Sequence, residues 1–286
     1  MSAKQLTSEE QKQFDELLKN GIHIPPRPSI LAEIETLLNS DDDDTNAIAN
    51  LIRQDTGLCA VVFKTVNSPF YGLSRPIDNI GKALVVLGIN QVMNIVKSVA
   101  LRQAIGGQEA AYLKFWERSG DIAALSSIIA GRASACNISP DQAYMAGLFH
   151  ECGVPILMQR FPGYCKAFRL GEGHNWPDFR EEDRCLSTDH TVVGYLVARH
   201  WNLPDFVCQA VRYHHDRLHM GHTAITLVSI LQMARHLYHK ISGLQETQWY
   251  EMRDQALEEL GLGLDGLTEF IRQFVPIDPN VVQSLG

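Results

Sequence analysis

A histidine lies directly beside a carboxylate in the segment GLFHECG, which spans residues 147–153. His150 offers an imidazole nitrogen and Glu151 offers carboxylate oxygens, and side chains of both types bind metal ions and transfer protons. Helical periodicity places His150 on the same face as Ala143 and Gly147. The pair therefore raises the question of whether this segment is a metal site, a modified metal site or the remains of one.

Further imidazoles point toward an apolar interior in the same way. His190 shares a helical face with Val193, and His214, which His215 follows directly, shares one with Val211. Helical bundles build metal sites from side chains that arrive from several helices. A hydrogen-bonded core histidine is the alternative for each of them, and the residues by themselves leave both interpretations open.

The elements that must position these side chains are predicted to be helices. Apolar residues recur at helical spacing along the chain and no sustained alternation of period two occurs, so we predict an all-α fold. After a short helix near the N-terminus, the predicted helices cover residues 30–38, 45–52, 58–66, 80–87, 90–101, 115–135, 140–150, 187–201, 204–213 and 224–241, with one or two more in the tail.

The strongest helix start is SPDQ at residues 139–142, which combines a capping serine, a proline in the first position and a glutamine in the third. A capping-box pattern of Ser8 with Gln11 predicts the start of the first helix, and Asp78 is the expected cap of the helix at 80–87. Residues 161–179 are mixed in character, and we expect them to be rich in loops.

A glycine-bearing loop, AIGGQEA at residues 104–110, marks the predicted boundary between two helical lobes. The 286 residues, 45% of them hydrophobic, are enough for a substantial core. The predicted organisation is an N-terminal helix at 1–23, an N-terminal lobe at 24–106, a second lobe at 107–242 and a C-terminal extension at 243–286.

The net charge of −8 opposes binding to nucleic acids and to anionic membrane surfaces. The six cysteines include no CxxC pair, which is typical of free thiols rather than of a disulfide framework. The N-terminal MSAKQLTSEEQKQF has no signal-peptide core, and no apolar run is long enough to span a bilayer. We therefore expect a cytoplasmic protein with no nucleic-acid or membrane partner.

Several segments resemble the HDOD family, which is a degenerate relative of the HD and HD-GYP metal-dependent phosphohydrolases. The resemblance runs from about Ile24 to about Ile241, and it implies a two-lobed helical bundle. Its most specific parts are HWNLPDFVCQAVRYHH and the loop that holds Asn67, Ser68, Tyr71 and Gly72. Other matching segments are IPPRPSILAEIETLLN, IANLIRQDTGLCAVVFKTVNSPFYG, WERSGDIAALSSIIA, AYMAGLFHECGVPIL and LQMARHLY.

The resemblance implies a set of metal ligands that this chain does not keep. An active HD site has a histidine on the helix before its His-Asp pair, where this sequence has Arg118, and no histidine lies between His23 and His150. The pair itself is His150-Glu151, and the aspartate of the last helix corresponds to Arg235. The downstream histidines of the family match His190, His214 and His215.

The substitutions by arginine change what this centre can bind. A guanidinium stays protonated and has no lone pair, so Arg118 and Arg235 cannot hold a metal. Two such charges at about 5 Å oppose a divalent ion by several kcal/mol. We therefore predict no active binuclear site, no catalytic residues and no cofactor. The remaining metal alternative is a mononuclear site formed by His150, His190 and His214.

The resemblance implies that the protein acts in bacterial signal transduction or regulation. It would act through contacts with a signalling partner, which the sequence does not name, or by sensing a small anionic or nucleotide ligand. Arg118 and Arg235 could hold such an anion, and the simpler alternative is an internal salt bridge to Glu151. The competing function is a metal-dependent phosphohydrolase that acts on a nucleotide or cyclic dinucleotide.

Overall fold

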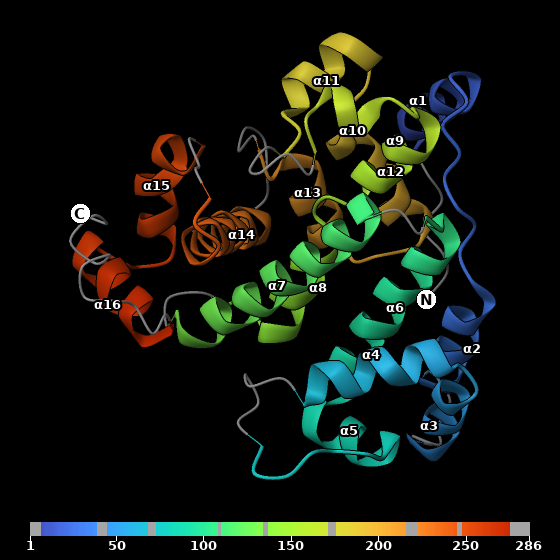
Figure 1. Ribbon diagram of the computed structural model, residues 1–286, viewed down its shortest axis with the longest axis vertical. Helices are drawn as coiled ribbons and strands as arrows, with labels where there is room; N and C mark the ends of the chain where they lie inside the picture. The colour runs from blue at the N-terminus through green and yellow to red at the C-terminus, as the bar shows by residue number, and fades with distance from the viewer. Residues whose placement is uncertain are drawn as a thin grey trace. The chain divides into compact units, whose positions relative to one another are not determined.

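The computed structural model describes residues 7–38, 45–67, 73–107, 110–133, 137–170, 176–215, 222–244 and 248–274. Within these ranges all regular elements are helices, so the predicted all-α fold is confirmed (Figure 1). The chain divides into two compact units, of which one is Pro25–Gly106 and the other combines Met1–Ile24 with Gly107–Gly286.

The unit Pro25–Gly106 is a small helical bundle. Its core contains Ile52 and Val62, which are fully buried. Asn79 caps the helix that begins at Ile80 by accepting a hydrogen bond from the backbone of Lys82, so the prediction of Asp78 as the cap was wrong by one residue. The helices of this unit are α2 (Ser29–Leu38), α3 (Thr45–Arg53), α4 (Thr56–Val66), α5 (Ile80–Leu87) and α6 (Ile89–Ile105).

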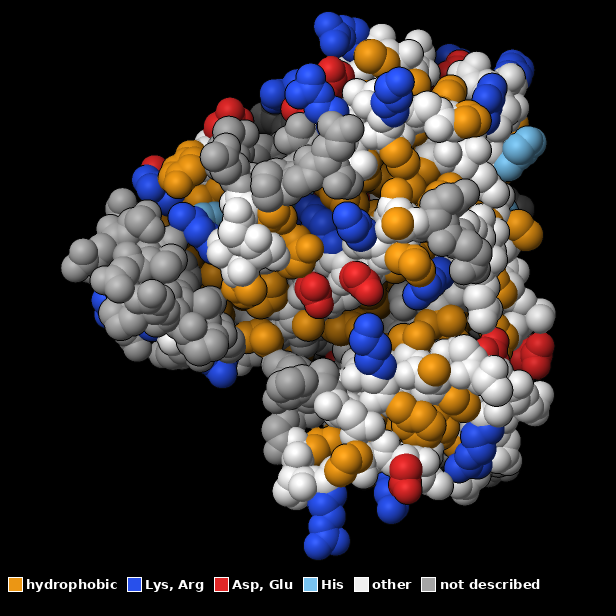
Figure 2. Space-filling model, viewed as in Figure 1, with side chains coloured by type: hydrophobic (Ala, Val, Ile, Leu, Met, Phe, Trp, Pro, Cys, Tyr) orange, Lys and Arg blue, Asp and Glu red, His pale blue; other side chains and the backbone are white. Residues whose placement is uncertain are grey.

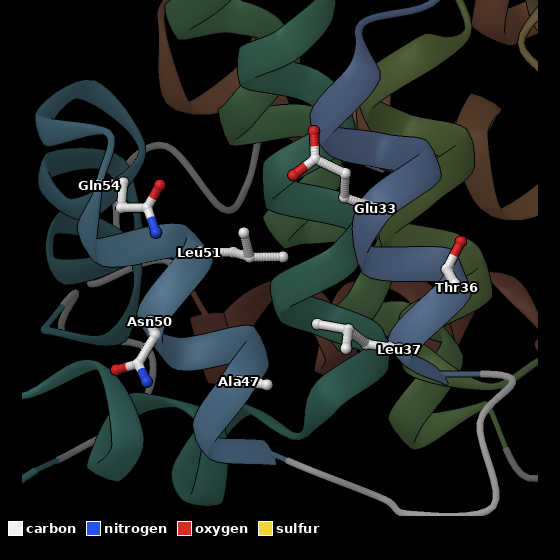
Figure 3. Close-up of a pocket in the computed structure, with 7 residues that line it drawn as sticks. All are labelled: Glu33, Thr36, Leu37, Ala47, Asn50, Leu51 and Gln54. Carbon is white, nitrogen blue, oxygen red and sulfur yellow. The ribbon is translucent and has the colours of Figure 1, made fainter.

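A groove runs between α2 and α3 of this unit (Figure 3). Leu37 and Leu51 extend into the space between the two helices, and the amide side chains of Asn50 and Gln54 lie along α3. Glu33 is the one ionisable side chain among the described residues that line the groove. Such a lining offers apolar contact and hydrogen bonds but no cluster of groups that could perform chemistry.

The other unit holds all the charged and histidine side chains that the sequence analysis singled out as a site. Its helices α7 and α8 pack side by side because Gly147 has no side chain, and a Cβ there would lie 2.5 Å from the Cα of Ala123. Its helices are α1 (Ser8–Lys19), α7 (Ala110–Arg132), α8 (Pro140–Phe149), α9 (Gly153–Arg160), α10 (Tyr164–Ala167), α11 (Phe179–Leu186), α12 (His190–His200), α13 (Asp205–Tyr213), α14 (His222–Ile241), α15 (Gln248–Glu259) and α16 (Leu264–Phe274).

The short helix α1 packs against α12 through polar contacts. Its capping box consists of Thr7 and Glu10, so the predicted box at Ser8 was wrong by one residue. The Glu10 carboxylate also accepts a hydrogen bond of 2.5 Å from the hydroxyl of Tyr195 and forms an ion pair of 3.0 Å with Arg199. One carboxylate therefore both starts α1 and fastens it to α12.

Helix α11 begins at Phe179, the last residue of the segment expected to be rich in loops, and no helix was predicted over its residues. The side chain of Asp178 caps the helix by accepting hydrogen bonds from two backbone amides. The helix is hard to recognise because its fully buried residue is the carboxylate Glu182 instead of an apolar side chain. The predicted start of the helix at 115–135 was also late, because α7 begins at Ala110.

No single helix among the described residues is long and apolar enough to cross a membrane. Within the part of the chain that the structure describes, only α5 and α6 taken together reach the required length and composition, and they are bent relative to each other by 114°. On the face drawn in Figure 2, acidic and basic side chains are interspersed among apolar ones. The described side chains on that face therefore form no continuous basic surface of the kind that binds nucleic acid.

Candidate functional site

The structure brings the candidate site residues from five parts of the chain into one buried centre. Arg118 comes from α7, the His150-Glu151 pair follows α8, and Arg235 comes from α14. His190 is the first residue of α12, and the two histidines 214 and 215 follow α13. All seven side chains are buried, with exposed fractions of 0–8%.

Glu151 forms an ion pair with Arg118 at this centre. Arg118 Nη1 donates a hydrogen bond to Glu151 Oε2, and the guanidinium lies 4.0 Å from the centre of the Trp176 ring. Burial by itself would raise the pKa of Glu151, but the positive charge of Arg118, together with smaller contributions from neighbouring groups that include Arg235, lowers that pKa to about 2. The carboxylate beside His150 is therefore one whose charge is matched by a guanidinium.

Arg235 lies at the other side of the same carboxylate without close contact. Its Nη2 is 4.0 Å from Glu151 Oε1, and its Nη1 is 3.5 Å from His215 Nδ1. Its Nε has no hydrogen-bond partner among the described residues, although the side chain is only 4% exposed. The centre thus holds two guanidinium groups around Glu151, and only Arg118 is hydrogen-bonded to it.

The hydrogen bonds of two histidines fix which ring nitrogen carries the proton. His150 Nδ1 lies 2.8 Å from the carbonyl oxygen of Gly147, and His214 Nδ1 lies 2.8 Å from that of Val211. A carbonyl oxygen only accepts, so Nδ1 must donate and Nε2 keeps the lone pair. Burial lowers the pKa of His150 to about 4 and that of His214 well below its ordinary value, so both rings are neutral near pH 7.

His190 is held by a carboxylate that the sequence analysis missed. Glu182 accepts hydrogen bonds from the backbone N and from Nδ1 of His190, at 3.0 and 2.5 Å, and from the hydroxyl of Tyr164. Burial would lower the pKa of His190, but the charge of Glu182 raises it. The face shared by Phe179, Glu182 and Leu186 at helical spacing is the signal that could have identified this carboxylate.

The backbone also keeps α12 against the His150-Glu151 pair. Gly153 begins α9, and a Cβ at this glycine would lie 2.1 Å from the carbonyl oxygen of His190. The side-chain amide of Gln232 on α14 donates a hydrogen bond to the backbone oxygen of His214. The centre is therefore positioned by close backbone packing as well as by its own ion pairs.

Comparison with protein families identifies the chain. Residues 24–217 match the model of the HDOD domain. The chain belongs to the HDOD family. Because this match covers α2 to α13, the HDOD domain includes Arg118, His150, Glu151, His190 and the two histidines that follow α13. Arg235 lies beyond the matched residues.

Individual HDOD relatives share the fold at low sequence identity. A protein of Marinobacter aquaeolei, provisionally named a signal transduction protein, is 21% identical with a TM-score of 0.69, over 97% of this chain and 65% of that chain. A protein of Shewanella amazonensis, provisionally named a metal-dependent phosphohydrolase, is 20% identical with a TM-score of 0.62, over 96% of this chain and 94% of that one. Identities this low establish the fold alone.

A third relative is an uncharacterized protein of Treponema pallidum, which is 24% identical over 212 residues. The match covers 74% of this chain and 41% of the relative, so this HDOD chain spans about two fifths of the length of the curated relative it matches. The comparison therefore carries no activity or partner over to this chain.

The donor set of the HDOD centre can be tested against a bound metal ion. His190, His214 and His215 each bring one ring nitrogen within 4.8 Å of the others, and the Nε2 atoms of His190 and His215 are 3.1 Å apart. Three imidazoles at this spacing suit one ion. A pair of ions does not fit, because Arg118, which has no lone pair, stands where the resemblance implies a ligand and engages Glu151.

The second group of HDOD motif residues lies in the unit Pro25–Gly106. Asn67 ends α4, and its side-chain amide forms hydrogen bonds of 2.6 and 2.8 Å with the backbone N and O of Ile77. Asn67 therefore ties the C-terminal end of α4 to the backbone at Ile77, ten residues further along the chain. Ser68, Tyr71 and Gly72 lie outside the residues that the structure describes.

Proposed function

We propose that this chain is a regulatory HDOD protein that acts in signal transduction, through contacts with a partner protein or by binding a small ligand, and not as a two-metal phosphohydrolase. The observation that carries the proposal is the buried ion pair between Arg118 and Glu151. The name of the Marinobacter relative agrees with a role in signal transduction.

The physical argument concerns the cost of replacing that ion pair by metal. A second ion at the centre would need Glu151 as a ligand, and Arg118 would then be buried without its partner. Breaking a buried ion pair in this way costs about 3–5 kcal/mol. Arg235, 4.0 Å from the same carboxylate, adds a second positive charge that repels a cation.

The test combines metal analysis with a hydrolysis assay. The protein is purified without chelator and without added metal, and its metal content is measured by mass spectrometry. Hydrolysis of bis(p-nitrophenyl) phosphate and of a cyclic dinucleotide is then measured with Mn²⁺ added. We expect neither tightly bound metal nor hydrolysis above background. One bound ion per chain together with hydrolysis that His190→Ala abolishes would overturn the proposal.

A second candidate function is a phosphohydrolase that uses a single metal ion and acts on a nucleotide or cyclic dinucleotide. The spacing of His190, His214 and His215 favours it, and the name of the Shewanella relative agrees with it. If an ion were bound there, it would supply an activated water, while Glu182 would orient His190. The same assay separates the two candidates, because only this one predicts metal-dependent turnover.

A further inference from the structure

The buried centre places two guanidinium groups around one carboxylate. Arg118 and Arg235 are both 4% exposed, and the carboxylate between them, Glu151, is hydrogen-bonded to Arg118. The other carboxylate near the centre, Glu182, is engaged by His190 and Tyr164. Arg235 is therefore a buried guanidinium whose nearest carboxylate oxygen among the described residues is 4.0 Å away.

Unused hydrogen-bonding atoms surround the same carboxylate, whose own Oε1 is an acceptor buried without a hydrogen-bond partner among the described residues. Arg118 Nη2 and Arg235 Nε are buried N–H donors without a partner among the described residues. His150 Nε2 and His214 Nε2 are buried lone pairs without a hydrogen-bond partner there, and the two rings are 5.2 Å apart between centroids. Buried polar atoms nearly always have partners, so such a group of unused atoms points to an occupant.

The kinds of unused atom restrict what that occupant can be. A metal cation would use the lone pairs of His150 and His214 but would meet the N–H groups of Arg118 and Arg235. Chloride would accept from the guanidinium groups but could donate nothing to the imidazoles. Water could do both but would bring no negative charge to Arg235, which shares Glu151 with Arg118 and is not hydrogen-bonded to it. An oxyanion that also carries a hydroxyl group meets all three demands.

We propose that this centre binds a singly charged, protonated phosphate group, with its oxygens accepting from Arg118 and Arg235 and its hydroxyl groups donating to His150 and His214. This inference rests on the proposed regulatory function and names the class of small ligand. Free phosphate in this charge state has two hydroxyl groups, one for each imidazole, whereas the terminal phosphate of a monoester supplies the same acceptor oxygens with one hydroxyl group.

The experiment compares phosphate with sulfate, which has a similar size and shape but no hydroxyl group near neutral pH. Thermal unfolding and titration calorimetry are carried out on the full chain in phosphate, sulfate or chloride at equal ionic strength, at about pH 6, where phosphate groups carry a proton. We expect phosphate to bind more tightly than sulfate by about tenfold or more, because sulfate leaves two imidazole lone pairs unmatched. Equal effects of phosphate and sulfate overturn the proposal.

Two variants locate the site. Arg235→Gln removes one guanidinium and should weaken phosphate binding by about tenfold or more, while Arg184→Gln removes an exposed arginine from α11 and should leave it unchanged. Unchanged phosphate binding in Arg235→Gln also overturns the proposal. If that variant does not fold, the comparison of anions on the unaltered chain still decides.

A further binding measurement distinguishes free phosphate from a phosphate monoester as the ligand. Adenosine monophosphate that binds more tightly than inorganic phosphate indicates a monoester, and tighter binding of inorganic phosphate indicates the free ion. Failure of phosphate binding would leave the regulatory role in place, because that role fails only if metal-dependent hydrolysis is found. The two failures are therefore distinguishable.

Discussion

At the level of single residues, Glu151 determines what the centre can do because its two oxygens face different groups. Oε2 accepts a hydrogen bond from Arg118, whereas Oε1 lies 3.6 Å from His150 Nε2 and 4.0 Å from Arg235 Nη2. A carboxylate in this position could bridge metal ions, but here it neutralises a guanidinium. The pair should therefore contribute to stability as a unit and lose that contribution when either member is removed.

A double-mutant cycle tests this coupling. Arg118→Met leaves Glu151 buried without its partner, and Glu151→Gln leaves Arg118 buried without a charged partner. Each substitution should therefore lower the free energy of unfolding by about 3–5 kcal/mol. The double variant should lose less than the sum of the two by about 0.5–3 kcal/mol. Urea unfolding followed by circular dichroism measures all three. Additive losses would show that the two charges do not stabilise each other.

The sequence predicts most members of the centre but not all. His150, His190 and His214 can be chosen because each is a polar residue on an otherwise apolar helical face. Arg118 and Arg235 can be chosen only because they stand where the resemblance implies metal ligands. Glu182 and Tyr164 could not be found in the same way, because their role depends on tertiary contacts between α10, α11 and α12.

At the level of elements, helix starts were predictable where the capping chemistry is local and unique. The box at Ser139 and Gln142 is present as expected and begins α8. For α1 two neighbouring residues can act as caps, and the structure selects Thr7 because its partner Glu10 also reaches Tyr195 and Arg199 on α12. Tertiary contacts of this kind decide between starts that local sequence leaves equivalent.

The contact between the start of α9 and the start of α12 predicts a strong effect of Gly153→Ala. The added Cβ would meet the His190 carbonyl oxygen at 2.1 Å, so α12 must move and carry His190 with it. We expect a loss of about 3 kcal/mol or more in urea unfolding. Gly120→Ala on α7 is the matched control, because nothing lies within 4 Å of its Cβ, and it should stabilise by up to about 1 kcal/mol. Equal effects of the two would contradict the packing argument.

The attachment of α1 to α12 predicts a pH-dependent effect of Glu10→Gln. Burial would raise the pKa of Glu10, but hydrogen bonds from Tyr195 and Thr7 and the charge of Arg199 lower it from 4.5 to about 2. Because the folded-state pKa is depressed, the stabilisation is complete above 4.5 and is lost as the pH falls toward about 2. At pH 7 the variant should be less stable by about 1–2 kcal/mol.

Urea unfolding of the unaltered chain and of Glu10→Gln at pH 7 and at about pH 3 measures this effect. The difference between them should shrink at the lower pH, because the unaltered Glu10 then loses its advantage. A difference of the same size at both pH values would mean that Glu10 acts through packing instead of through its charge.

At the level of the whole molecule, the family match ends before the part of the chain that completes the centre. Residues 24–217 match the HDOD domain, whereas Arg235 and Gln232 lie on α14, which packs on α7 and α15. The helices after the match therefore belong to the same folded unit as Arg118. Composition and periodicity predict that such helices exist, but not that one of them supplies a buried guanidinium.

This dependence predicts that a substitution on α15 is felt at the centre. Trp249 is 2% exposed and stacks on His236 of α14, with ring centroids 4.5 Å apart. Trp249→Ala should therefore lower the free energy of unfolding by about 3–5 kcal/mol and speed hydrogen exchange along α14. Its neighbour Tyr250 is 63% exposed, so Tyr250→Ala should change stability by less than about 0.5 kcal/mol. If both variants lose the same stability, or if exchange in α14 is unchanged in Trp249→Ala, α15 does not support the helix that carries Arg235.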